Sequence, residues 1–218
     1  MKTTLKIDFV SDVSCPWCAI GLASLLQAAE QVADAVTLDL HFQPFELNPQ
    51  LGPEGQDVAE HLMDKYGMDA EQLAQNQEAI RARGAELGFT FNMAGRRAYN
   101  TFDAHRLLYW AGELGENRQL ALKQALLAAN FTHGQNVSDV ETLVTLAQTV
   151  GLDSDEARAV LGSDRYAGEV REQQAFYQQQ GISSVPAVII NEQYLISGGQ
   201  PPETFAKALR QIASGDAG

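Results

Sequence analysis

Cys15 and Cys18 are the only two cysteines among 218 residues, and only Pro16 and Trp17 separate them. At this spacing the two sulfurs are close enough to form a disulfide. In thiol–disulfide exchange, one thiolate attacks a substrate disulfide and a second thiol then resolves the mixed disulfide. The pair therefore predicts a redox site.

The cysteines lie where a predicted strand gives way to a predicted helix. Apolar residues alternate over residues 5–9 and recur at helical spacing over residues 20–29. Pro16 suits a first helical position, where its missing N–H costs nothing. The unpaired N–H groups and the dipole of a helix start favour a thiolate. Asp12 would oppose this effect if its carboxylate pointed toward Cys15.

A lone Cys-x-x-Cys is also compatible with half of a zinc site or with two small core residues. Zinc takes four ligands, yet the sequence contains no second pair of this kind. Its histidines, which are His41, His61, His105 and His133, lack ligand spacing. A structural disulfide usually closes a longer loop than this one would. We therefore expect a redox pair and no metal.

The composition is that of an ordinary globular protein, with 45% hydrophobic and 20% charged residues. The formal charge of −13 argues against nucleic acid, because a phosphate backbone requires a basic surface. No segment is long and apolar enough to span a bilayer, and residues 1–6 do not resemble a signal peptide. We expect no membrane partner and a cytoplasmic location, where disulfides are mostly transient or catalytic.

The order of predicted elements indicates an α/β domain that is interrupted by helices. A second strand over residues 36–42 follows the first helix, and residues 43–49 can form neither a central strand nor a helix interior. A helical block then covers residues 56–180, with helices predicted at 58–66, 70–87, 97–114, 117–130, 139–150, 154–161 and 164–180. Strands at 187–190 and 193–196 and a helix at 203–212 complete the chain.

We divide the chain into a discontinuous α/β domain, residues 1–50 and 182–218, and a helical insertion domain, residues 51–181. With Cys-Pro-Trp-Cys on the first helix and Val185-Pro186 before the third strand, this βαβ…ββα arrangement resembles the thioredoxin fold with the helical insertion of the DsbA family. Four sequence strings resemble those of the FrnE-like branch, whose members are cytosolic relatives of DsbA. They are FVSD (9–12), PFELNP (44–49), NTFDAHRL (100–107) and SGGQPP (197–202).

The resemblance implies roles for several residues. Val185-Pro186 would be the cis-proline of the fold, placed against the cysteines, with the Val185 backbone free to pair with a bound peptide or thiol ligand. From sequence alone, Pro186 could equally be a trans proline at the start of a strand. Cys15 would be the exposed attacking sulfur and Cys18 the buried resolving one, supported by Pro16 and Trp17. The dipeptide between the cysteines lacks the histidine of DsbA, so we expect a less oxidising pair.

Further candidates are less specific. Asn100, His105 and Arg106 belong to one of the shared strings and are candidates for substrate binding, although a histidine on an apolar helix face is often a core residue. One of Arg96, Arg97 and Arg106 could hold a carboxylate of a thiol ligand such as glutathione, or all could form ordinary surface ion pairs. Gln200 could meet an anion at the start of the last helix, or be a turn residue.

The favoured function is a thiol–disulfide oxidoreductase or isomerase that acts on protein or small-molecule thiols and disulfides. No resident cofactor is expected, and glutathione is left open as a co-substrate. One alternative is a glutathione-dependent isomerase or transferase similar to the kappa class, whose members carry serine where Cys15 stands. Another is a peptide-binding chaperone that does not need the cysteines. The sequence leaves the direction of electron flow and the oligomeric state open.

Overall fold

The computed structural model describes residues 2–52, 54–115 and 117–215. Within these ranges the strands are β1 (Thr3–Ser11), β2 (Val36–Pro44), β3 (Gln56–Asp57), β4 (Arg97–Ala98), β5 (Ala187–Ile190) and β6 (Tyr194–Ser197). The helices are α1 (Pro16–Gln31), α2 (Val58–Tyr66), α3 (Ala70–Glu86), α4 (Phe102–Glu113), α5 (Arg118–Phe131), α6 (Val140–Thr149), α7 (Ser154–Leu161), α8 (Ala167–Gln179) and α9 (Pro202–Ser214).

The first and last parts of the chain form one four-stranded sheet in the order β2-β1-β5-β6. Strand β1 runs parallel to β2, with Phe9 opposite Phe42, and antiparallel to β5, with Phe9 opposite Val188. Strand β6 pairs antiparallel with β5. Because parallel strands need a crossover, α1 connects β1 to β2. Strand β1 thus lies inside the sheet and ends at the loop that carries Cys15.

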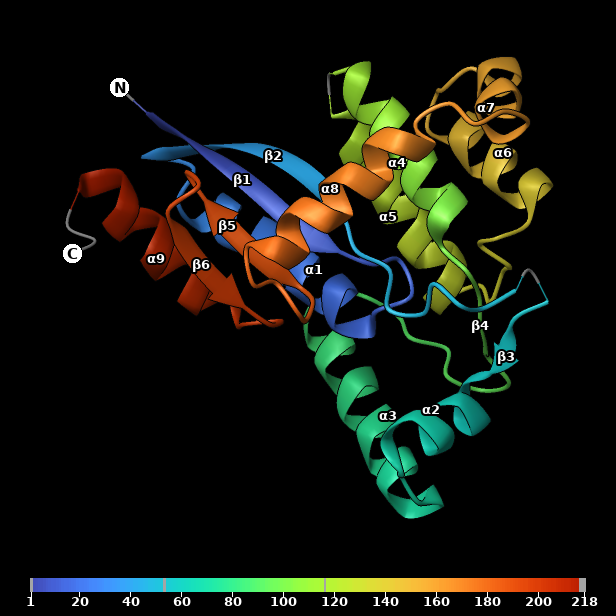
Figure 1. Cartoon of the computed structure of the whole chain (residues 1–218). Helices are drawn as coiled ribbons and strands as arrows, with labels where there is room; N and C mark the ends of the chain where they lie inside the picture. Colours follow the sequence, from blue (N-terminus) through green and yellow to red (C-terminus); the bar gives the residue numbers. More distant parts are fainter. Residues whose placement is uncertain (1, 53, 116, 216–218) are drawn as a thin grey trace.

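Helices cover both faces of this sheet. Ile7 and Phe9 are buried in a core with residues of α1 and α9, such as Leu25 and Phe205. Val10 packs on the opposite face against Tyr177 of α8. This split follows from the two-residue period of a strand. Figure 1 shows α8 lying across the face of the sheet opposite α1.

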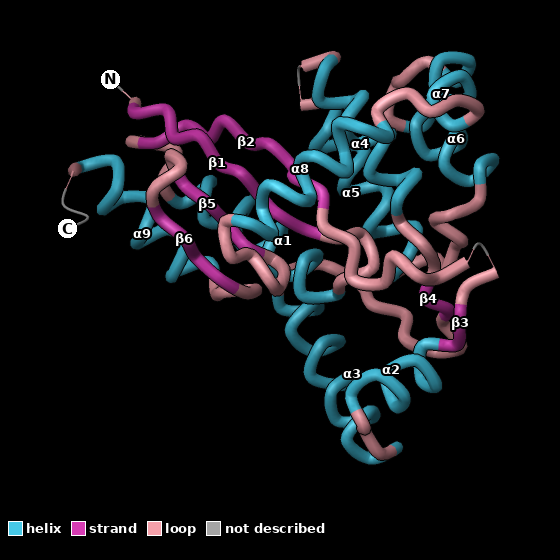
Figure 2. The backbone as a smooth tube through the Cα atoms, viewed as in Figure 1, coloured by secondary structure: helices cyan, strands magenta, loops and turns pink. Residues whose placement is uncertain are grey.

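The insertion has a core of its own, formed by α4, α5, α6 and α7 around side chains such as Leu107 and Leu126. Val13, from the loop between β1 and α1, is fully buried in this helical core. The helices α2 and α3 project away from the sheet, and β3 and β4 form a small separate ladder near them (Figures 1 and 2). The insertion therefore touches the loop that precedes the cysteines.

The predicted βαβ, helical block and ββα order is confirmed, as is the α/β class. Several predicted element bounds differ in the structure. Strand β2 continues through Gln43 and Pro44, which is possible because β2 is an edge strand and needs no N–H on its free side. The helix predicted from Arg97 begins at Phe102, because the Asn100 side chain accepts the Phe102 N–H at 2.9 Å.

Residues 97–98 pair instead with β3, so the block of 56–180 is not wholly helical. The helix predicted from residue 164 begins at Ala167. The domain boundaries at residues 50 and 182 stay predictions. Within the described ranges, no helix is both long and apolar enough to cross a membrane.

Candidate redox site

The Cys-x-x-Cys segment forms the start of α1. Cys15 occupies the N-cap position with an extended backbone, φ −92° and ψ 114°, and Pro16 follows as the first helical residue. The Cys18 N–H donates to the Cys15 carbonyl at 3.0 Å, which begins the helix. Both thiols are free. The first turn carries no acidic residue, so its N–H groups are open to a thiolate.

Cys15 is more enclosed than the resemblance implied, with 4% of its surface exposed, while Cys18 is completely buried. The Cys15 thiol donates to the Val185 carbonyl at 3.6 Å. The Val185–Pro186 peptide bond is cis. Trp17 is 39% exposed beside this contact. The segment before β5 therefore covers the Cys15 sulfur, which borders a cavity and not the open surface.

This cavity has a volume of about 530 Å³. Its wall combines the start of α1, the inner sides of α2 and α3 and the segment before β5, and most of the surface that faces the cavity is apolar. The lining residues include Cys15, Trp17, Leu62, Ile80, Met93 and Arg96. Its volume lies within the range of small-molecule sites, roughly 300–1,000 Å³. Cys15 is thus the thiol that a ligand in the cavity would meet.

Asp12 holds the loop before Cys15 in place. Its carboxylate accepts the Leu47 N–H at 2.7 Å and the Ser14 hydroxyl at 2.8 Å, and lies 3.5 Å from His105 Nε2. Burial alone would raise the pKa of Asp12, but His105, Leu47 and Ser14 together lower it to about 2. The 3.5 Å contact is long for a hydrogen bond, so we regard the His105 contribution as mainly electrostatic. The carboxylate is thus engaged away from the thiols.

Asn130 also fixes this loop, since its side-chain amide donates to the Val13 carbonyl at 2.9 Å. Asn130 belongs to α5 and contributes to the cavity wall. The insertion therefore positions the cysteine loop through Asn130, through His105 and through the burial of Val13.

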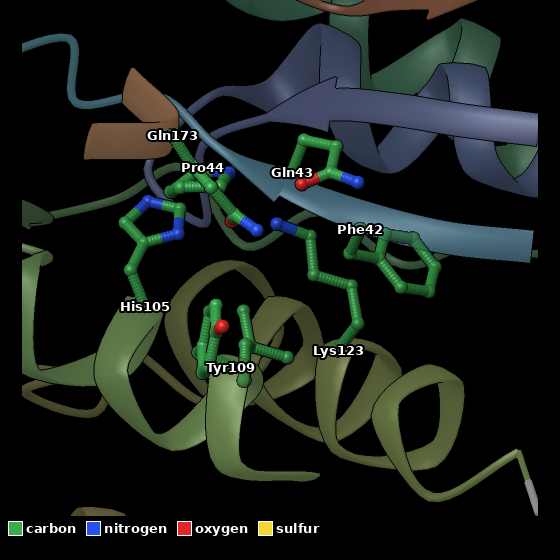
Figure 3. A pocket seen from close by; sticks show the side chains of 8 residues that line it. Phe42, Gln43, Pro44, His105, Tyr109, Lys123 and Gln173 are labelled. Carbon is green, nitrogen blue, oxygen red and sulfur yellow. The ribbon is translucent and has the colours of Figure 1, made fainter. Parts of the chain in front are cut away.

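Lys123 of α5 is fully buried, and its Nζ has no hydrogen-bond partner among the described residues. Figure 3 shows its side chain extending from α5 toward β2, beside Phe42 and Gln43, with His105 facing the same space. This space is a cavity of about 10 Å³. Burial lowers the pKa of Lys123, an effect that the nearby Cys18, Asp12 and Cys15 oppose.

Burial raises the pKa of the Cys18 thiol well above its ordinary value, and the adjacent Cys15 raises it further. The positive charge of Lys123 acts in the opposite direction. Burial therefore makes the Cys18 thiol harder to deprotonate, and the positive charge of Lys123 makes its deprotonation easier.

The structure separates the other predicted binding residues from the cavity. The Asn100 amide donates to the Pro49 carbonyl at 3.2 Å, and the Gln200 amide donates to the Ser197 carbonyl at 2.8 Å. Arg106 is 4% exposed and binds Asp103 and the carbonyls of Val160, Ser163 and Arg165. His105 lies behind the cysteine loop, against Asp12. Of these four residues, His105 is the one that contacts the Asp12 carboxylate in the loop before Cys15.

The sequence did not identify Lys123 as a candidate. It identified Arg96 only as one of three arginines that could hold a carboxylate. A signal for Lys123 was present, because Leu120 and Leu127 lie three residues before and four after it, on the same helix face. A lysine within such an apolar stripe is unusual for a soluble helix. For Arg96 no local pattern distinguishes it from Arg97.

A family model described as a DSBA-like thioredoxin domain matches residues 6–210. The structure is similar to that of a probable DsbA oxidoreductase from Streptomyces coelicolor, with 36% identity, coverage of 98% of this chain and 92% of that one, and a TM-score of 0.89. The protein YwbO of Bacillus subtilis, described as uncharacterized, is 26% identical over 94% of this chain and 96% of its own length.

A more distant structure, at 16% identity, shares the fold. It is the cytosolic disulfide reductase DsbM from Pseudomonas aeruginosa, solved with GSH, with a TM-score of 0.65 and coverage of 95% of this chain and 98% of that one.

Proposed function

Because the chain belongs to the family of DSBA-like thioredoxin domains, we propose that it is a thiol–disulfide oxidoreductase that exchanges disulfides through Cys15 and Cys18. One observation carries the proposal. Two free thiols lie at the start of one helix, with Cys15 on the wall of a cavity and Cys18 buried behind it. An attacking and a resolving sulfur require this arrangement.

In the reducing direction, the Cys15 thiolate attacks one sulfur of a substrate disulfide. A Cys15–substrate bond forms, the substrate S–S bond breaks, and the leaving sulfur takes up a proton. Cys18 then loses its proton and attacks the Cys15 sulfur, which forms the Cys15–Cys18 disulfide and releases the second substrate thiol. Two electrons pass from the protein dithiol to the substrate, and the oxidising direction is the reverse.

Other residues support these steps. The N-terminal N–H groups of α1 stabilise negative charge on Cys15. The positive charge of Lys123 favours the Cys18 thiolate that the second step requires. The Val185 backbone, with Pro16 and Trp17 beside it, forms the edge where a substrate would lie against Cys15.

We assign the protein to the FrnE-like branch on the four sequence strings given above, and we propose thiols and disulfides of the cytoplasm as its partners. Glutathione remains a candidate co-substrate. A transferase-like role is less favoured, because such a role does not require the second thiol.

The test is to equilibrate the protein with a series of glutathione redox buffers and to count free thiols by maleimide labelling. We expect one protein disulfide, absent from Cys15→Ser and Cys18→Ser. Cys18→Ser should accumulate a mixed disulfide at Cys15, whereas Cys15→Ser should not. A potential near −230 mV or higher would support an oxidase or isomerase, and one near about −270 mV would support a reductase.

If the two thiols form no disulfide in any buffer, the oxidoreductase proposal fails. In that case peptide binding that survives Cys15→Ser would support the chaperone alternative.

A further inference from the structure

Arg96 is a buried cation without an anionic partner. It is 9% exposed, and no carboxylate of the described residues forms an ion pair with it. Its Nε has no hydrogen-bond partner there, and its Nη1 contacts the Met93 sulfur at 3.9 Å. The guanidinium lies over the Phe131 ring, 4.3 Å from the centroid, which fixes its orientation. Burial lowers the pKa of Arg96 to about 10, so it stays charged at neutral pH.

Arg96 contributes to the wall of the same cavity as Cys15. The described residues that line this cavity include no aspartate and no glutamate, although the protein carries 28 acidic and 15 basic residues. Ionised groups buried without a partner are costly. An anion in this cavity would remove that cost for Arg96.

The two other cationic candidates of the cavity wall already have partners. Lys65 Nζ donates to the Leu47 carbonyl at 2.9 Å and to Asn48 Oδ1 at 2.7 Å. His61 contacts Gln56 Oε1 through Nδ1 and Asn48 Oδ1 through Nε2. Among the lining cations of the described residues, Arg96 is therefore the one whose charged group has no oxygen acceptor.

The neighbouring arginines do not compete for this role. Arg97 is exposed and donates to the carbonyls of Glu54 and Gly55. Arg106 is bound to backbone carbonyls and to Asp103. Neither residue lines the cavity. The contacts of the three arginines therefore identify Arg96 as the candidate for carboxylate binding, which the sequence alone could not do.

We propose that the cavity binds a low-molecular-weight thiol or disulfide with an apolar body and a carboxylate, and that Arg96 holds the carboxylate while the sulfur meets Cys15. This inference rests on the proposed function for its redox step, but not for binding. It follows from the apolar wall, from the unpaired guanidinium and from the place of Cys15 on the same wall.

Lipoate is a suitable probe, because it carries a cyclic disulfide on a short alkyl chain that ends in a carboxylate. Lipoamide is the matched neutral control. The Cys15 thiolate would attack one ring sulfur, the ring S–S bond would break, and the freed sulfur would take a proton. Attack by Cys18 on Cys15 would then release dihydrolipoate and leave the Cys15–Cys18 disulfide, so the protein is oxidised and the probe reduced by two electrons.

The experiment measures the single-turnover rate of the reduced protein at subsaturating probe. Hydrogen bonds to charged groups contribute enough that wild type should react with lipoate about tenfold or more faster than with lipoamide. Arg96→Met should abolish this preference, so that the variant reacts with lipoate and lipoamide at the same rate. Arg97→Met, which removes the same charge at the neighbouring position, should keep the preference, and Arg96→Lys should keep part of it.

A second measurement needs neither a variant nor redox chemistry. Calorimetric titration of the wild-type protein should show that octanoate binds more tightly than octanamide by a similar factor, and octanoate should slow the reaction with lipoate. Equal rates with lipoate and lipoamide, or a preference that survives in folded Arg96→Met, would overturn the inference. So would equal affinities for octanoate and octanamide.

The two proposals can fail separately. If octanoate binds in an Arg96-dependent manner but the cysteines form no disulfide in any glutathione buffer, the carboxylate site stands and the oxidoreductase proposal is wrong. If the cysteines react with both probes at equal rates, the oxidoreductase proposal stands and the carboxylate site is wrong.

Discussion

The insertion contributes two buried cations, Arg96 and Lys123, and they differ in their surroundings. Arg96 shares a cavity of about 530 Å³ with Cys15, whereas Lys123 faces a space of about 10 Å³ and interacts with Cys18. Neither forms an ion pair with a carboxylate of the described residues. The larger space admits a ligand, but the smaller admits at most about one water molecule.

An unpaired buried charge can therefore act in two ways. Where there is room, it is available to an external anion. Where there is none, it acts on the titrating groups that are already nearby, here mainly Cys18. We accordingly expect Arg96 to govern which substrate binds and Lys123 to govern how fast the mixed disulfide is resolved.

The largest expected effect is on that resolution step. Lys123→Met removes the charge that lowers the pKa of Cys18, so less thiolate forms at neutral pH. Because a thiolate of higher pKa is intrinsically more nucleophilic, the loss is partly offset, and we expect resolution to slow roughly tenfold near pH 7. The measurement is stopped-flow release of a chromogenic thiol from a preformed mixed disulfide, as a function of pH.

The midpoint of that pH profile should rise in Lys123→Met and stay unchanged in Arg96→Met. Lys207→Met, which removes an exposed lysine from α9, is the matched control. An unshifted profile in Lys123→Met would remove the distinction between the two cations.

The next effect is on acid stability. The pKa of Asp12 is about 2 in the folded protein against an ordinary value of 3.8, so its contribution is fully present above about pH 4 and is lost as the pH falls through 2. That contribution amounts to about 2 kcal/mol. Asp12→Asn should flatten the dependence of unfolding free energy on pH in this interval, as measured by urea denaturation.

Asp39→Asn is the control, because Asp39 is exposed and pairs with His41 on the surface. If Asp39→Asn flattened the pH dependence of the unfolding free energy as much as Asp12→Asn, the Asp12 carboxylate would not be the source of that dependence.

A smaller effect concerns the cost of burying Lys123. An unpaired buried polar group is destabilising, so Lys123→Met should raise the unfolding free energy by about 1–2 kcal/mol near pH 7. Burial lowers the pKa of Lys123 in the folded protein. At pH values between the folded and the unfolded pKa, the unfolded state therefore binds more protons than the folded state. In this pH interval the unfolding free energy of the wild type rises with pH. The advantage of the variant should shrink as the pH approaches 10.5, and an advantage that grew would contradict the assignment.

The smallest expected effect on redox chemistry is that of Arg106. Lysine cannot reproduce the several directed contacts of its guanidinium, so Arg106→Lys should lower the melting temperature. The exchange rates and the preference for lipoate should not change, because Arg106 does not line the cavity. A variant that folds but loses the preference would show that Arg96 is not the sole carboxylate anchor.

Local patterns were sufficient for much of the fold. The strand and helix order, most element bounds to within a few residues, and the position of Cys15 at a helix start followed from periodicity and from Pro16. The errors arose where a partner distant in sequence decided the outcome, such as the pairing of Arg97–Ala98 with β3. Asn100 and Arg106 were selected on a shared string, which cannot show that backbone carbonyls already occupy their donors.

By itself the sequence determined the dithiol, because the spacing of Cys15 and Cys18 brings them together through one turn of helix. Only the tertiary structure decided what surrounds each sulfur, because Arg96 and Lys123 lie about eighty and one hundred residues away along the chain. Periodicity tells which helix face is buried but not which side chain it meets. The packing of the insertion against the rest of the fold places Arg96 on the wall of the cavity that Cys15 borders. It also places Lys123 where its charge acts on Cys18.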